Sequence, residues 1–116
     1  MTIMIYGIRH CDTMKKAFAW LDAQGLSYVF HDFKKTGVEV QALRQWAEIW
    51  GWESLINRKG TTWRRLSEAD RAVADAESAF LLMQAHPSMI RRPILIADKK
   101  TLLGFDAVLW SATLQP

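Results

Sequence analysis

Residues 2–33 read TIMIYGIRHCDTMKKAFAWLDAQGLSYVFHDF, and their pattern decides the fold of the chain. The apolar run at 2–6 predicts a short buried strand. Residues 14–24 carry apolar side chains at helical spacing and predict an amphipathic helix that Gly25 ends. Aromatic and β-branched residues fill 26–33 and predict a second strand. These elements together form a βαβ unit, in which the two strands run parallel.

The middle of the chain predicts an inserted helical segment at about 38–86. Residues 36–39 have the form of a capping box, and apolar residues then repeat at helical spacing over 40–50. Residues 55–66 show no clean period and are expected to form an irregular connection. A cap signal then opens an alanine-rich helical stretch over 67–84, with one break expected near its middle.

The last part of the chain predicts a return to sheet. Residues 93–97 and 101–105 are short apolar runs on either side of a turn, which is typical of an antiparallel hairpin. Asp106 is placed to cap a final helix over 107–112. The order βαβ, helical insert, ββα predicts an α/β fold with a thioredoxin-like mixed four-stranded sheet, in one domain that spans residues 1–116.

The composition limits the class of protein. One cysteine excludes an internal disulfide and a four-cysteine zinc site, and the three histidines are not at metal-ligand spacing. No apolar run approaches the ~20 residues that span a bilayer, and the N-terminal residues lack a basic region and a cleavage site. The net charge of +3 is spread along the chain rather than clustered. We expect a cytoplasmic monomer without metal or bound cofactor, which binds neither nucleic acid nor membranes.

Cys11 lies between the first predicted strand and the first predicted helix, where Asp12 or Thr13 is expected to cap the helix. Reactive groups of open α/β sheets gather in such loops, beyond the carboxyl ends of parallel strands. A helix N-terminus stabilises a thiolate, and Arg9 and Lys15 are nearby cations that also suit an anionic substrate, although Asp12 opposes them. We therefore predict a lowered thiol pKa. The alternative is that Cys11 is a small buried hydrophobic residue.

Met14 occupies the position three residues after Cys11, where a two-cysteine redox motif has its second thiol. The protein therefore cannot close a local disulfide. Any thiol redox cycle at Cys11 has to be resolved by a thiol from another molecule.

Arginines in two regions are candidates for anion binding. Arg92 directly precedes Pro93 and the third predicted strand, so it is expected near the sheet end, where its guanidinium suits a carboxylate or an oxyanion. Arg58, Arg64 and Arg65 lie in the irregular connection, where the alternative is a solvated surface position. Only ~5% of X–Pro bonds are cis, so the sequence alone does not favour a cis bond before Pro93.

Three segments resemble the glutaredoxin-coupled arsenate reductase family, which includes Spx-type regulators and YffB-type proteins. They are YGIRHCDTMKKA at 6–17, NRKGTTWR at 57–64 and IRRPIL at 90–95. The resemblance runs over essentially the whole chain, and the segments at 55–66 and 103–106 are most similar to the YffB type. It implies a thioredoxin-like fold with a helical insertion.

The resemblance also implies roles for particular residues. It implies that Cys11 is the nucleophile, and that Arg92, beside a cis Pro93, binds the oxyanion. It implies glutathione as the co-substrate and glutaredoxin as a partner.

The chain departs from the arsenate reductase pattern at two anion-binding arginines. Asn57, with Arg58 beside it, aligns with one of them, and residues 104–105 align with the other without supplying an arginine. This difference counts against arsenate as the substrate. We expect a glutathione-dependent monothiol oxidoreductase for disulfide or oxyanion reduction through Cys11. The alternatives are an arsenate reductase coupled to glutaredoxin and an Spx-like regulatory module that binds proteins, although Met14 removes the paired-cysteine switch of many Spx proteins.

Overall fold

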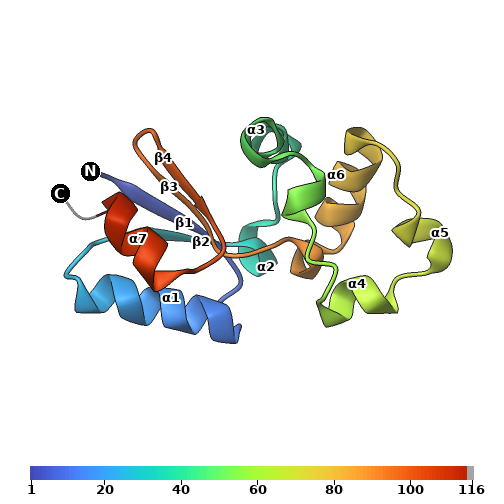
Figure 1. Cartoon of the computed structure of the whole chain (residues 1–116). Helices are drawn as coiled ribbons and strands as arrows, with labels where there is room; N and C mark the ends of the chain where they lie inside the picture. Colours follow the sequence, from blue (N-terminus) through green and yellow to red (C-terminus); the bar gives the residue numbers. More distant parts are fainter. Residues whose placement is uncertain (115–116) are drawn as a thin grey trace. The chain divides into compact units, whose positions relative to one another are not determined.

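The computed structural model describes residues 1–114 and divides into two compact units (Figure 1). The first unit contains Met1–Thr36 and the chain from Arg92 onward, and the second contains Gly37–Arg91. The second unit matches the predicted helical insertion, with a few residues added at its C-terminal end. That the whole chain behaves as one domain stays a prediction.

A four-stranded mixed sheet forms the centre of the first unit, in the order β2-β1-β3-β4. Strand β1 pairs in parallel with β2, whereas the β1–β3 and β3–β4 pairs are antiparallel. The strands are β1 (Ile3–Gly7), β2 (Val29–Asp32), β3 (Ile94–Ala97) and β4 (Lys100–Leu103). This arrangement confirms the predicted thioredoxin-like sheet, the parallel βαβ unit and the hairpin.

Helices α1 (Asp12–Ala23) and α7 (Ala107–Leu114) supply the rest of the core of this unit. Both lie on the same side of the sheet in Figure 1. Alternate strand residues face them, because side chains of a strand point to opposite faces in turn. The buried cluster consists of Ile3, Ile5, Met14, Ala17, Leu21, Leu95, Ala97, Leu102, Trp110 and Leu114. Each large apolar side chain buried there contributes roughly 1.5–3 kcal/mol.

Local capping explains where the helices of this unit begin and end. Gly25 has a φ of 68° and ends α1 as predicted, because glycine adopts this left-handed conformation at little cost. Asp106 caps α7 as predicted, since its Oδ1 accepts the Leu109 N–H at 3.0 Å. The predicted cap of α1 is wrong. Cys11 itself is the N-cap, with extended backbone, and Asp12 already belongs to the first turn, where its charge suits the helix dipole.

The second strand covers Val29–Asp32 rather than the predicted 26–33, and Asp32 determines where it ends. Its Oδ1 accepts the Lys34 N–H at 3.0 Å, and the chain turns into the short helix α2 (Phe33–Thr36). This local side-chain bond competes with the sheet ladder. It outweighs the strand preference of Phe33, which is buried in α2 instead.

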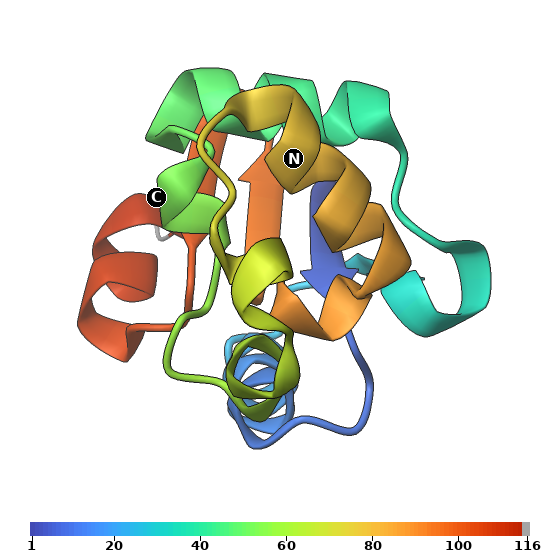
Figure 2. The same cartoon turned by 90° about the vertical axis from the view of Figure 1, so that its right-hand side faces the viewer.

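The second unit is helical (Figure 2). Its elements are α3 (Val40–Trp50), η1 (Glu53–Leu55), α4 (Thr61–Arg65), α5 (Glu68–Arg71), α6 (Ala76–Ala85) and η2 (Pro87–Met89). Helix α3 ends before Gly51 as predicted, and the Arg44–Glu77 ion pair of 2.7 Å joins it to α6. Ser67 caps α5 and Asp75 caps α6, which confirms the predicted break in the alanine-rich stretch.

Two predictions for this unit are wrong. The predicted capping box at 36–39 does not form, because α3 begins only at Val40 and its N-cap, Glu39, makes no side-chain cap bond. The connection at 55–66 is more regular than expected. It contains α4, and Ile56 forms an antiparallel bridge with Ile90. This pairing joins segments that are far apart in the sequence, so the periodicity within 55–66 cannot predict it.

Candidate active site

Cys11 stands at the end of the loop that leads from β1 into α1. It is half-buried and packs against the core cluster of the first unit. Its carbonyl accepts the Lys15 N–H at 2.9 Å, the first hydrogen bond of the helix. As the N-cap, Cys11 lies at the end of the helix where the first backbone N–H groups have no partner within the helix. The structure thus confirms the predicted position of the thiol at a helix N-terminus.

Hydrogen-bond donors around the sulfur stabilise the thiolate. Burial raises the pKa of the Cys11 thiol, but hydrogen bonds from the Met14 N–H and the Arg92 side chain lower it. The positive charge of Arg92 and a hydrogen bond from the Thr13 N–H lower it further, so the net pKa lies below its ordinary value. A lowered pKa increases the thiolate fraction near neutral pH, and the thiolate is the nucleophilic form of cysteine.

Sheet pairing brings Arg92 to Cys11. In the antiparallel β1–β3 pair, Tyr6 lies opposite Ile94. The C-terminal end of β1 and the N-terminal end of β3 are therefore neighbours at the same end of the sheet. Arg92 is half-buried and precedes Pro93 through a cis peptide bond, as the family resemblance implies. The side chain that reaches the thiol therefore comes from a distant part of the sequence.

Pro93 is buried and connects Arg92 to the segment that follows β4. The Gly104 N–H donates to the Pro93 carbonyl at 2.8 Å, and the Gly104 carbonyl accepts the Trp110 Nε1–H at 3.0 Å. The indole of Trp110 is fully buried, with the rings of Trp20 and Phe105 edge-on to it. These contacts anchor the sheet edge that carries Arg92.

Gly7 is a site residue whose role was not predicted. A Cβ at this position would overlap Met14 Sδ, would lie 2.7 Å from Met14 Cε and would lie 3.4 Å from Arg92 Cβ. The missing side chain lets the fully buried Met14 pack against the end of β1, which seats the first turn of α1. The available sequence signal was a glycine at the end of a strand, which often marks a close backbone approach.

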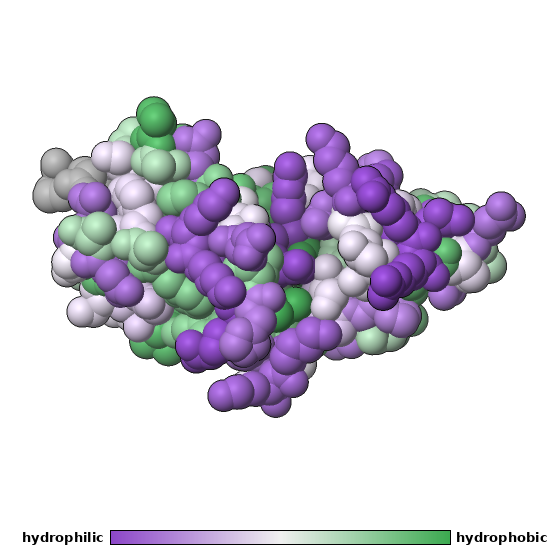
Figure 3. All heavy atoms as spheres, turned by 90° about the horizontal axis from the view of Figure 1, so that it is seen from below, coloured by the Kyte–Doolittle hydropathy of each residue, from purple (hydrophilic) through white to green (hydrophobic). Residues whose placement is uncertain are grey.

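Arg9 and Lys15 do not supply the charge that lowers the thiol pKa, contrary to our expectation. Met14, Thr13 and Arg92 supply the lowering contacts. The Arg9 guanidinium carbon instead lies 5.1 Å from the ring centroid of Phe30. Lys15 is on the exposed face of α1, which also carries charged Asp12, Lys16 and Asp22. Hydrophilic side chains are prominent in the view from below (Figure 3). Anion binding by Arg9 and Lys15 stays a prediction.

The other predicted anion-binding residues, Asn57 and Arg58, belong to the second unit. The Asn57 N–H donates to the Met89 carbonyl at 2.8 Å, and Asn57 Oδ1 accepts the Lys59 N–H at 3.3 Å. The Arg58 guanidinium carbon lies 5.3 Å from the centroid of the Trp63 ring. Their part in binding a substrate of Cys11 stays a prediction.

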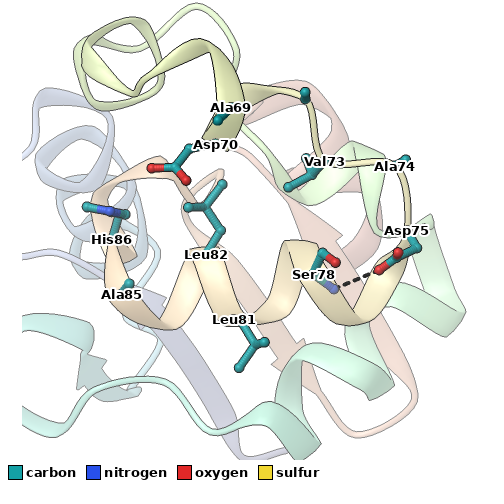
Figure 4. A pocket seen from close by; sticks show the side chains of 11 residues that line it. Ala69, Asp70, Val73, Ala74, Asp75, Ser78, Leu81, Leu82, Ala85 and His86 are labelled. Carbon is teal, nitrogen blue, oxygen red and sulfur yellow. Dashed lines mark hydrogen bonds between the residues drawn. The ribbon is translucent and has the colours of Figure 1, made fainter.

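The remaining features of residues 1–114 give fewer indications of a chemical function. Residues 1–114 contain no group of three or more His, Cys, Asp or Glu side chains placed to hold a metal, and no helix long and apolar enough to cross a membrane. A hollow of about 620 Å³ lies between α5 and α6 (Figure 4). Its lining is mainly alanine and leucine, with Asp70 and His86 at one end and Asp75 engaged with the Ser78 N–H. It contains no thiol.

Two solved structures cover nearly the whole chain. A YffB protein is 46% identical, with a TM-score of 0.92 over 97% of this chain and 98% of that one. An arsenate reductase (ArsC) related protein from Brucella melitensis is also 46% identical, with a TM-score of 0.76 over 100% of this chain and 97% of its own.

Curated relatives also match most of the chain. An uncharacterized protein of Haemophilus influenzae is 38% identical over 90% of this chain and 91% of its own length. The global transcriptional regulator Spx of Listeria innocua is 23% identical over 90% of this chain and 80% of its own length. Residues 6–112 match the model of the ArsC family, and this match includes both Cys11 and Arg92. The chain therefore belongs to the ArsC family.

Proposed function

We propose that this protein is a glutathione-dependent monothiol reductase in which Cys11 is the nucleophile. The observation that carries the proposal is the position of Cys11 as the N-cap of α1, where hydrogen bonding and charge from Arg92 lower the pKa of the thiol and favour the thiolate. A free thiol of this kind suits a reducing compartment, and we propose the cytoplasm. Membership of the ArsC family, with arsenate-reductase-related neighbours, supports thiol-dependent reduction.

The proposed cycle is a pair of thiol–disulfide exchanges followed by reduction of the product. The Cys11 thiolate attacks one sulfur of a substrate disulfide; the S–S bond breaks, and the other sulfur leaves as a thiolate that takes a proton from water. A glutathione thiolate then attacks the substrate sulfur of the mixed disulfide and releases Cys11. A second glutathione reduces the resulting glutathione–substrate disulfide. In sum, two glutathione molecules become glutathione disulfide and one substrate disulfide becomes two thiols.

Each residue at the site has a part in this cycle. Arg92 stabilises the attacking thiolate and is the group that orients a carboxylate of glutathione or an anionic substrate. Met14 fills the position of a second thiol, and Cys11 is the sole cysteine of the sequence. The mixed disulfide can therefore be resolved only by a thiol from another molecule, which is the role we assign to glutathione or to glutaredoxin.

The pH dependence of Cys11 alkylation, read by mass spectrometry with and without oxidised glutathione, tests this proposal. We expect a thiol pKa well below 8.5, one glutathione adduct at Cys11, and release of the adduct by reduced glutathione. Cys11→Ser is the matched control and should take up neither reagent. An ordinary pKa together with no adduct would contradict the proposed enzyme.

The second candidate is a protein-binding module of the Spx type, and the match to Spx regulators over most of the chain favours it. In that case Cys11 senses redox state or has no role, and Cys11→Ser would keep its protein partners. Arsenate reduction is the third candidate. Residues 104–105, which follow the last strand and supply no arginine where the reductases have one, count against it. An arsenate reduction assay with glutaredoxin and glutathione distinguishes it from disulfide reduction.

A further inference from the structure

A polar hollow of about 310 Å³ lies within the second unit, where two distant segments run side by side. The Asn57 N–H donates to the Met89 carbonyl at 2.8 Å, and the Arg91 N–H donates to the Leu55 carbonyl at 2.7 Å. The bridge between Ile56 and Ile90 lies between these two bonds. This antiparallel pairing holds Arg91 beside the loop that follows Ile56.

Positive charge dominates the lining of this hollow. Arg58, Lys59 and Arg91 all line it, and Glu53 is the one carboxylate among its lining residues. No ion pair within 4.0 Å joins any of the three cations to a carboxylate of residues 1–114. An anion that enters the hollow therefore meets three cationic side chains and does not have to displace an existing partner.

Contacts inside the unit orient the donors. The guanidinium carbon of the exposed Arg58 lies 5.3 Å from the centroid of the Trp63 ring, a cation–π contact that restricts where this side chain lies. Asn57 Oδ1 accepts the Lys59 N–H, and this bond directs the amide nitrogen the other way. Gly60 makes room for that nitrogen, because a Cβ there would lie 2.8 Å from Asn57 Nδ2.

We infer that this hollow binds a small molecule through a carboxylate or phosphate group, independently of Cys11. Arginine and lysine are the usual ligands of both groups, and arginine matches their paired oxygens with two parallel N–H donors. The volume is at the lower end of the range for small-molecule sites, so the ligand is small. The residues that carry the inference all belong to the second unit and include neither Cys11 nor Arg92.

NMR titrations of the full chain with inorganic phosphate and, separately, with succinate test this inference at constant pH and ionic strength. We expect saturable shifts of the backbone amides of residues 53–59 and 91, and the same affinity in Cys11→Ser. Arg91→Ala and Lys59→Ala should each weaken binding by about three- to tenfold. Lys99→Ala removes an exposed lysine in the β3–β4 turn and should leave binding unchanged.

The two titrations also separate the sources of the anionic group. Saturation by phosphate alone indicates a phosphorylated ligand, and saturation by succinate alone indicates a carboxylate. Spectral dispersion shows whether each variant folds, and Arg91→Gln replaces Arg91→Ala if it does not. Shifts that do not saturate, shifts confined to residues around Cys11, or an affinity unaffected by both substitutions would overturn the inference.

Discussion

The Arg92 side chain lowers the pKa of the Cys11 thiol through hydrogen bonding and its positive charge, although the two residues lie far apart in the sequence. The antiparallel pairing of β1 with β3 produces this contact, because it places Ile94 opposite Tyr6 at the end of β1. Arg92, just before β3, and the loop that follows β1 are therefore neighbours at the same end of the sheet. The charge that favours the thiolate is consequently a product of sheet topology.

Replacing Arg92 tests how far it controls the thiol. In Arg92→Ala the pKa of Cys11 should rise, because a hydrogen bond and a positive charge are lost together, and alkylation at pH 7 should slow by about three- to tenfold. Arg92→Lys keeps the charge, so its alkylation rate should lie between those of wild type and Arg92→Ala. The matched control is Arg91→Ala, which removes the neighbouring arginine. Equal alkylation rates in wild type and Arg92→Ala would rule out this role.

The lowered thiol pKa also makes stability depend on pH. The folded state binds the Cys11 proton less tightly than the unfolded state does. The Cys11 thiolate therefore contributes its full stabilisation above the pKa of the unfolded state, about 8.5. It is lost as the pH falls through the lowered folded pKa. Urea unfolding with a reductant present should show that wild type gains stability over Cys11→Ser as the pH rises through this window. A constant difference between the two proteins would mean that the thiol pKa is the same folded and unfolded.

Gly7 and Met14 should behave as a coupled pair. Gly7→Ala should lower the free energy of unfolding by about 1–3 kcal/mol, because the new Cβ overlaps Met14 Sδ. Met14→Ala should cost about 2–5 kcal/mol, since Met14 is fully buried. In the double variant the smaller side chain leaves room for the new Cβ, so the combined loss should be less than the sum. Strict additivity in urea unfolding would show that the two sites do not touch.

A second thiol at position 14 should change the redox chemistry. Met14→Cys places a thiol three residues after Cys11 within the first turn of α1. We expect oxidised glutathione to leave a stable adduct on wild type and an internal disulfide, with the adduct released, on Met14→Cys. Thiol titration and mass spectrometry distinguish the two products. A stable adduct on the variant as well would show that the side chain at position 14 cannot reach Cys11.

Trp110 should stabilise the first unit through its indole N–H as well as its rings. Trp110→Phe should cost about 1–3 kcal/mol, because the bond to the Gly104 carbonyl is lost and the smaller ring leaves space in a fully buried position. Trp20→Phe is the control, since Trp20 packs edge-on against Trp110 but is only half-buried. Thermal unfolding should rank Trp110→Phe below Trp20→Phe, and the reverse order would contradict this account.

Local spacing was sufficient to predict most helices and strands of this chain. The apolar stripe of α1, the stop at Gly25 and the caps at Ser67 and Asp106 each depend on residues within one or two turns, so the sequence reports them directly. The same holds for the position of the one cysteine before a helix, and for Met14 in the place of a second thiol. These features determined the fold class and the candidate nucleophile.

Tertiary structure decided which groups surround that nucleophile. Arg9 and Lys15 are close to Cys11 in sequence, yet Arg92 supplies the side-chain contact, because strand order and not chain distance determines what meets at a sheet edge. The contact of Gly7 with Met14 and the pairing of Ile56 with Ile90 have the same origin. Sequence periodicity records which face of an element is buried. It does not record which distant residue is packed against that face, since this depends on how the strands pair.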